Sequence, residues 1–140
     1  MKSPIIISII FYNLLKTEKD YISKFQPFGI ILFSKNIKSL PQLKRLVSSI
    51  KLHSPSTLLF IDQESGIVDR FKFFKDLNFL DNYEYYKIYL KDEKLAKLLI
   101  FLKSYITSYY LREWGFHSNT VPVLDVSIHK TAKFISQRTF

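Results

Sequence analysis

The fold follows from short apolar runs such as Thr57-Leu58-Leu59-Phe60-Ile61-Asp62, which ends abruptly in a carboxylate. Three similar runs occupy residues 5–11, 29–33 and 121–126. Runs without a polar alternation are typical of strands that are buried on both faces, as the strands of a parallel sheet are. We therefore expect four parallel strands, near residues 5–11, 29–33, 57–62 and 120–126.

Helical patterns separate these runs. We expect helices over Thr17–Lys24, over Leu40–Leu52 after the capping residue Ser39, and over Asp92–Trp114 before Gly115. The last helix carries one apolar stripe, which we expect to face the core: Leu95, Leu98, Leu99, Leu102, Ile106 and Tyr109. Residues 76–89 are polar and aromatic without a clear period, and we expect a long loop there.

The resulting order, β-α-β-α-β-α-β, predicts right-handed crossovers and a parallel α/β sheet. Periodicity alone leaves two architectures open, a doubly wound sheet and half of a (β/α)8 barrel. The chain of 140 residues is expected to form one domain, and a hydrophobic content of 47% excludes a disordered chain.

Composition also bears on partners and compartment. The net charge is +9, but only four of the 21 basic residues are arginines and the lysines are scattered, so we expect neither nucleic acid nor membrane as a partner. Without cysteine the chain has no disulfide or thiolate metal site.

Residues 1–12 superficially resemble a signal peptide, but no small-residue cleavage site follows. We expect a buried strand there and a cytoplasmic protein.

Polar residues follow the expected strands. Ser34-Lys35-Asn36 follows the second, Asp62 ends the third and Asp125 lies at the end of the fourth. In parallel α/β folds, functional groups collect at the carboxyl ends of strands. A carboxylate there can also cap the next helix or pair with an arginine, and the residues alone leave both interpretations open for Asp62.

The order of five segments is more specific. They are Gly29-Ile-Ile-Leu-Phe-Ser-Lys-Asn36, Ile61-Asp-Gln-Glu-Ser-Gly66, Arg70-Phe71, Val121-Pro-Val-Leu-Asp-Val126 and Gln137-Arg-Thr-Phe140. This series resembles the N-terminal part of glycoside hydrolase family 3, in the branch of the bacterial β-N-acetylhexosaminidases. There the segments read roughly GxILFxRN, DQEGGxVxR, APVLDV and GxRSF. The resemblance covers most of the chain.

The resemblance implies a TIM barrel, of which residues 1–140 would form the first four βα steps. It implies substrate-binding roles for Asp62, Arg70 and Arg138, with Asp125 and Gly66 in support. A carboxylate accepts two sugar hydroxyls and a guanidinium donates in a plane, as sugar binding requires. Departures from the family pattern occur at Ser8, Phe11, Lys35, Ser65 and Asp69.

In this family the aspartate nucleophile and a His–Asp acid/base lie well beyond residue 140, and His53, His117 and His129 match no family motif. We therefore expect no catalytic residue, cofactor or metal ligand in this chain, and no turnover by the chain alone. The implied reaction is hydrolysis of terminal β-linked N-acetylglucosamine in cell-wall (peptidoglycan) recycling. The alternatives are an inactive split-gene remnant, a half-barrel that pairs with a separately encoded C-terminal half or with itself, and a basic protein that binds nucleic acid or a membrane surface.

Overall fold

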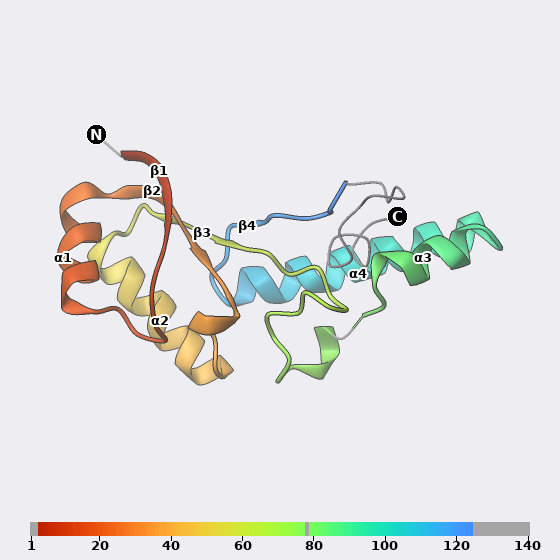
Figure 1. Ribbon diagram of the computed structural model, residues 1–140, viewed down its shortest axis with the longest axis horizontal. Helices are drawn as coiled ribbons and strands as arrows, with labels where there is room; N and C mark the ends of the chain where they lie inside the picture. Colours follow the sequence, from red (N-terminus) through yellow and green to blue (C-terminus); the bar gives the residue numbers. More distant parts are fainter. Residues whose placement is uncertain (1–2, 78, 125–140) are drawn as a thin grey trace, which may run out of the picture. The chain divides into compact units, whose positions relative to one another are not determined.

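The computed structural model describes residues 3–77 and 79–124 (Figure 1). The chain divides into two compact units. The first comprises the residues up to Asp62 together with Tyr110–Thr120, and the second comprises Gln63–Tyr109 and the residues after Thr120.

The first unit contains a four-stranded sheet. Its strands are β1 (Ser3–Ser8), β2 (Pro27–Leu32), β3 (Leu58–Ile61) and β4 (Ser118–Asn119). They lie in the order β1-β2-β3-β4, and every neighbouring pair is parallel. The predicted α/β fold with parallel strands is confirmed. The apolar run at the N-terminus forms a strand as predicted, but the expected burial is wrong, because β1 is an edge strand in which Ile5 and Ile6 are exposed.

Two helices connect the first three strands. Helix α1 (Lys16–Phe25) joins β1 to β2, and α2 (Leu40–His53) joins β2 to β3. The two helices pack beside each other (Figure 1). Helix α2 begins as its sequence predicts, with the Ser39 hydroxyl accepting from the Gln42 N–H and a proline in the first turn. The core of this unit consists of fully buried aliphatic side chains: Ile9, Ile22, Ile30, Leu32, Leu43, Leu46, Ile50, Leu59 and Ile61.

The fourth strand differs from its prediction. Strand β4 is Ser118–Asn119, and residues 121–124 form no regular structure. Its ladder bonds run from the His117 N–H to the Leu59 carbonyl, at 2.8 Å, and from the Thr120 N–H to the Ile61 carbonyl, also at 2.8 Å. Pro122 has no N–H that could continue this ladder. The strand prediction for this run was based on its apolar pattern and did not consider the proline. Residues 125 and 126 lie outside the described residues.

The second unit contains the 3-10 helix η2 (Lys75–Leu77) and the helices α3 (Asn82–Tyr89) and α4 (Glu93–Glu113), whose last residues belong to the first unit. The expected loop over residues 76–89 is therefore wrong, because α3 occupies its second half. Asp81 caps this helix, accepting from the Glu84 N–H at 2.9 Å. An aspartate followed three residues later by a glutamate resembles a helix-start signal, which outweighed the irregular apolar pattern.

Helix α4 has nearly the predicted bounds, but its predicted core face is wrong. Four members of the apolar stripe are exposed, Leu95, Leu98, Leu102 and Tyr109, while Leu99 and Ile106 are half-buried. The buried residues of α4 are instead Ala96, Thr107 and Leu111. Small side chains at two of these positions allow the helix to pack closely on its less apolar face. Within the described residues, no helix is long and apolar enough to cross a membrane.

Candidate functional site

Asp62 leaves the carboxyl end of β3 from a fixed backbone position. The carbonyl of the preceding residue, Ile61, accepts from the Thr120 N–H at 2.8 Å and from the Thr120 hydroxyl at 3.1 Å. The Asp62 side chain is half-buried. The backbone that carries this carboxylate is thus fixed by the sheet itself, at the edge where functional groups of parallel sheets gather.

Asn36 organises the neighbouring strand ends. It ends the 3-10 helix η1 (Ser34–Asn36), which follows β2, and it is fully buried. Its amide nitrogen donates to the carbonyls of Ile9 and Phe11, each at 3.1 Å, and its amide oxygen accepts from the Phe33 N–H at 3.0 Å. One side chain therefore ties the loop after β1 to the end of β2. Lys35, where the family has arginine, is exposed.

A second amide reinforces the same loop. The Gln42 side chain, at the start of α2, donates to the Tyr12 carbonyl at 2.6 Å and to the Asn36 carbonyl at 3.1 Å. Its oxygen accepts from the Lys38 N–H at 2.8 Å. Sequence reasoning did not single out this residue. The available signal was a glutamine directly beside a core position, Leu43, because a buried amide requires hydrogen-bond partners.

In the second unit, Gln63 and Asp69 hold the backbone around Arg70. Gln63 is only 1% exposed. Its side-chain oxygen accepts from the Arg70 N–H at 2.7 Å, and its nitrogen donates to Asp69 Oδ1 at 3.0 Å. The same Asp69 oxygen accepts from the Phe71 N–H at 2.9 Å. Asp69, a departure from the family pattern, therefore has a structural role: it completes a clamp that fixes the main chain of Arg70.

The turn between these residues requires unusual backbone angles. Ser65 has φ of 78° and Gly66 has φ of 64°, and Ser65 forms an antiparallel bridge with Val68. A Cβ added to Gly66 would lie 2.7 Å from the Cβ of Asp81, so glycine is needed for space as well as for φ. At Ser65 the left-handed conformation costs about 1 kcal/mol. The glycine that the family places there avoids this cost.

Glu64 lies in the electrostatic field of a buried lysine. The Lys103 ammonium, on α4, lies 5.1 Å from the centre of the Tyr85 ring. Burial lowers the pKa of Lys103, and the carboxylates of Glu64 and Asp81 oppose this shift. Burial also raises the pKa of Tyr85. Glu64 and Asp81 thus help to keep a desolvated ammonium charged, which is a stabilising role for Glu64.

The two described histidines, His53 and His117, lie at the end of α2 and just before β4, whereas Asp62 follows β3. His117 precedes β4, at the amino end of that strand, and its Nδ1 accepts from the Leu59 N–H at 3.0 Å. Its Nε2 lies 3.1 Å from Lys51 Nζ, and its pKa is lowered by burial and by that charge. His53 ends α2, with Nδ1 2.8 Å from the Ser49 carbonyl. Both histidines have structural surroundings, and His129 lies outside the described residues.

The predicted sugar-binding residues are distributed over the chain. Asp62 belongs to the first unit and the half-buried Arg70 to the second. Asp125 and Arg138 lie outside the described residues. The convergence of Asp62, Arg70 and Arg138 on one cleft stays a prediction.

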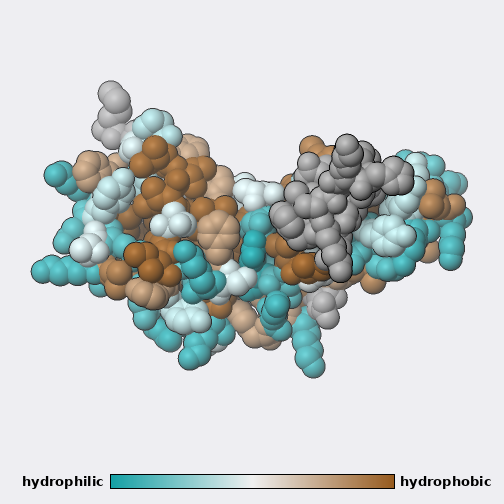
Figure 2. Space-filling view, viewed as in Figure 1, coloured by the Kyte–Doolittle hydropathy of each residue, from teal (hydrophilic) through white to brown (hydrophobic). Residues whose placement is uncertain are grey.

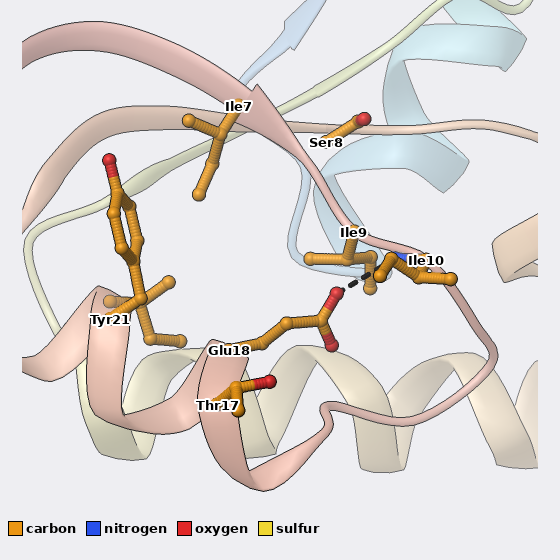
Figure 3. Close-up of a pocket in the computed structure, with 8 residues that line it drawn as sticks. Ile7, Ser8, Ile9, Ile10, Thr17, Glu18 and Tyr21 are labelled. Carbon is orange, nitrogen blue, oxygen red and sulfur yellow. Dashed lines mark hydrogen bonds between the residues drawn. The ribbon is translucent and has the colours of Figure 1, made fainter.

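A cavity of about 350 Å³ lies between β1 and α1 (Figure 3). Figure 3 shows the Glu18 carboxylate accepting from the Ile10 N–H, at 2.8 Å, and its other oxygen accepts from the Leu15 N–H at 2.8 Å. These bonds close the start of α1, so this carboxylate serves the fold. None of the predicted site residues lines this cavity. Most of the remaining lining residues are isoleucines, and the full set is Ile7, Ser8, Ile9, Ile10, Thr17, Tyr21 and Ile22.

Comparisons with known proteins add to this geometry. No protein-family model matches the chain. A β-hexosaminidase of Thioalkalivibrio sulfidiphilus is 28% identical over 141 residues, covering 98% of this chain and 39% of the relative. One of Nitrosomonas eutropha is 39% identical over 70 residues, covering 49% of this chain and 20% of the relative. The structure matches that of NagZ from Neisseria gonorrhoeae with a TM-score of 0.89 and 27% identity, covering 99% of this chain and 42% of NagZ.

The chain is similar in sequence to bacterial β-hexosaminidases and in structure to NagZ. It spans less than half the length of the NagZ chain that it matches. A second structure, of N. gonorrhoeae NagZ in complex with N-trifluoroacetyl-D-glucosamine, matches with a TM-score of 0.82 and 26% identity, over 89% of this chain and 38% of that chain. The resemblance inferred from the five sequence segments is confirmed.

Proposed function

We propose that this chain forms part of the sugar pocket of a β-N-acetylglucosaminidase that hydrolyses terminal β-linked N-acetylglucosamine from cell-wall fragments. The observation that carries the proposal is the match to NagZ over 99% of the chain at 27% identity. A matched NagZ was solved in complex with N-trifluoroacetyl-D-glucosamine, a derivative of that sugar. The chain has no cysteine, which suits the reducing cytoplasm that we propose as its compartment.

In this proposal, Asp62 accepts hydroxyls of the terminal sugar from its fixed position after β3. Arg70 donates from a backbone that the Gln63–Asp69 clamp holds still. Arg138 adds a second guanidinium, and Asp125 and Gly66 support the pocket. Preorganised donors and acceptors bind a sugar tightly because little ordering cost is left at the moment of binding.

The bond-breaking step needs two further groups. A retaining glycosidase places a nucleophilic carboxylate and an acid/base about 5 Å apart at the anomeric carbon. Glu64 is buried and helps to keep Lys103 charged, so we assign it to structure rather than to catalysis. We propose that the nucleophile and the acid/base come from a complementing half.

We further propose a (β/α)8 barrel in which β1 pairs with the last strand of that half. The first and last strands of a closed barrel pair, so no edge remains. Here β1 is an edge strand in which Ile5 is 40% and Ile6 49% exposed, and Figure 2 shows hydrophobic residues concentrated over β1. An exposed apolar edge of this kind is what a pairing strand would cover.

A chimera tests the function. The matched 42% of N. gonorrhoeae NagZ is replaced by this chain, and hydrolysis of a chromogenic β-N-acetylglucosaminide is measured. We expect turnover by the chimera, none by the isolated chain, and a loss of at least about tenfold in kcat/KM for the chimera with Asp62→Ala, since hydrogen bonds to a charged group contribute about 1.5–3 kcal/mol.

The matched control is Asp20→Ala, which removes an exposed carboxylate from α1. It should leave turnover unchanged. A folded chimera without turnover would favour the alternative of an inactive remnant. Turnover that survives Asp62→Ala would remove Asp62 from the pocket.

A further inference from the structure

Helix α4 carries an exposed line of apolar residues, which we call the α4 seam. It consists of Leu95, Leu98, Leu102, Tyr105 and Tyr109, whose exposed fractions are 45%, 53%, 41%, 65% and 56%. The residues follow one another at intervals of three, four, three and four. This alternation is the a/d heptad pattern of helices that pack side by side. The seam therefore has the spacing of an interface with another helix.

The seam lies opposite the face that α4 buries in its own unit. At about 100° per residue, the seam is centred on the side of the helix away from Ala96, Lys103 and Thr107. Ala96 and Thr107 are buried and Lys103 is half-buried. A helix that buries an alanine, a threonine and a single leucine, Leu111, while exposing two tyrosines and three leucines has its larger apolar face turned to solvent. An apolar face of this size is typical of an interaction site.

The exposed area suits pairing with a second copy. With Phe101, which is 63% exposed and flanks the seam, the side chains present about 700 Å² of surface, given that one large aromatic side chain buries 150–250 Å². A stable interface of standard size buries about 800 Å² per partner. Two copies of the seam would therefore come close to this size without any further surface.

The charges at the two ends of α4 select an antiparallel order. Positions ten residues before and after Leu102 carry Asp92 and Arg112, and positions eleven residues away carry Lys91 and Glu113. All four are exposed. An antiparallel pair centred on Leu102 puts Asp92 of one copy level with Arg112 of the other, and Lys91 level with Glu113. A parallel pair would put like charges level, which is unfavourable.

We propose that two copies of this chain associate through the α4 seam as antiparallel helices, with the two-fold axis near Leu102. The inference is independent of the sugar-binding function, because it uses only residues of α4 and its ends. It also differs from pairing through the open edge of β1, which would leave the seam exposed.

Sedimentation of the purified chain at micromolar concentration tests the association. We expect a dimer, and a dimer dissociation constant raised at least a hundredfold by Leu98→Glu, since each dimer would bury two unpaired charges. The matched control is Leu52→Glu on α2, where the leucine is 79% exposed and lies off the seam. It should leave the dimer intact. Circular dichroism checks that both variants keep their helices.

Single cysteines test the geometry, because the natural chain has none. Leu102→Cys should give a disulfide-linked dimer on mild oxidation. Leu95→Cys should not link to itself, but should link to Tyr109→Cys when the two variants are mixed. Self-linking of Leu95→Cys would show a parallel pair and overturn the proposed order. A monomeric wild-type chain, or a dimer that survives Leu98→Glu, would overturn the use of the seam.

Discussion

The two units of the molecule use different means to hold their structure. The first unit buries aliphatic side chains between a parallel sheet and two helices, and its buried polar residues, such as Asn36 and Gln42, tie loops to that framework. In the second unit, the segment around Arg70 depends on the amide of Gln63, the carboxylate of Asp69 and a turn with two positive φ angles. The comparison teaches that the backbone of Asp62 is held by the ladder bonds of a packed sheet, whereas the backbone of Arg70 is held by side-chain hydrogen bonds in a turn.

The largest expected effect comes from the packed unit. Leu59→Ala in β3 removes a fully buried side chain and should lower the free energy of unfolding by about 3 kcal/mol, as leucine truncations in cores do. Urea denaturation measures the change. Leu52→Ala, at a position that is 79% exposed, should change stability by less than about 0.5 kcal/mol. Equal effects of the two variants would mean that the sheet does not hold this unit together.

The next effect breaks the hydrogen-bonded segment. Gln63→Leu has a similar size but leaves the Arg70 N–H and one lone pair of Asp69 without their partner, which should cost about 2 kcal/mol. Hydrogen exchange should show faster exchange at the Arg70 amide, while amides of β2 keep their protection. Protection lost equally in both units would contradict separate means of support.

A smaller change of opposite sign sharpens the comparison. Ser65→Gly relieves a left-handed conformation and should raise the free energy of unfolding by about 0.5–1 kcal/mol, whereas Gly66→Ala should lower it because its new Cβ would approach Asp81. Denaturation midpoints of both variants measure this. A destabilised Ser65→Gly would show that the serine hydroxyl contributes more than its backbone angle costs.

The smallest expected effect is a pH dependence in the first unit. The lowered pKa of His117 means that its neutral form is favoured by folding. Stability from this residue is present above the ordinary histidine pKa of about 6.5, and is lost as the pH falls from there through the lower pKa of the folded state. Melting temperatures between pH 7.5 and 5.5 should therefore fall less in His117→Gln than in the wild type. His53→Gln serves as the control, and a parallel fall in all three proteins would exclude His117 as a cause.

Much of the first unit was predictable from local pattern. The runs at Gly29–Phe33 and Thr57–Asp62 mark strands because continuous apolar stretches suit a sheet that is covered by helices. The run at Ile5–Phe11 also marks a strand, but β1 ends at Ser8 and lies at an edge, so its apolar side chains are largely exposed. The short β4 was misplaced because the apolar pattern of residues 121–126 is stronger than that of Ser118–Asn119. Strand β4 is set instead by ladder bonds to β3, and local sequence does not reveal which residues pair.

The sequence predicted which residues form the candidate site, but it did not predict which residues hold them in place. The motif containing Asp62 and Arg70 was recognisable from its amino-acid sequence. The roles of Gln63 and Asp69, in contrast, depend on hydrogen bonds that form only when the turn closes. The stripe on α4 was correctly identified as apolar and wrongly assigned to the core. Periodicity shows which face of a helix avoids water, and it does not show what covers that face.

The central claim is that Asp62 and Arg70 bind one sugar. The most direct measurement is a titration of the isotopically labelled chain with N-acetylglucosamine, followed by NMR of backbone amides and arginine side chains. The account predicts saturable shifts at the residues around Asp62 and at the Arg70 guanidinium, with both sets lost in Asp62→Ala and retained in Asp20→Ala. Shifts confined to one of the two residues, or unchanged by Asp62→Ala in a folded chain, would contradict a shared pocket.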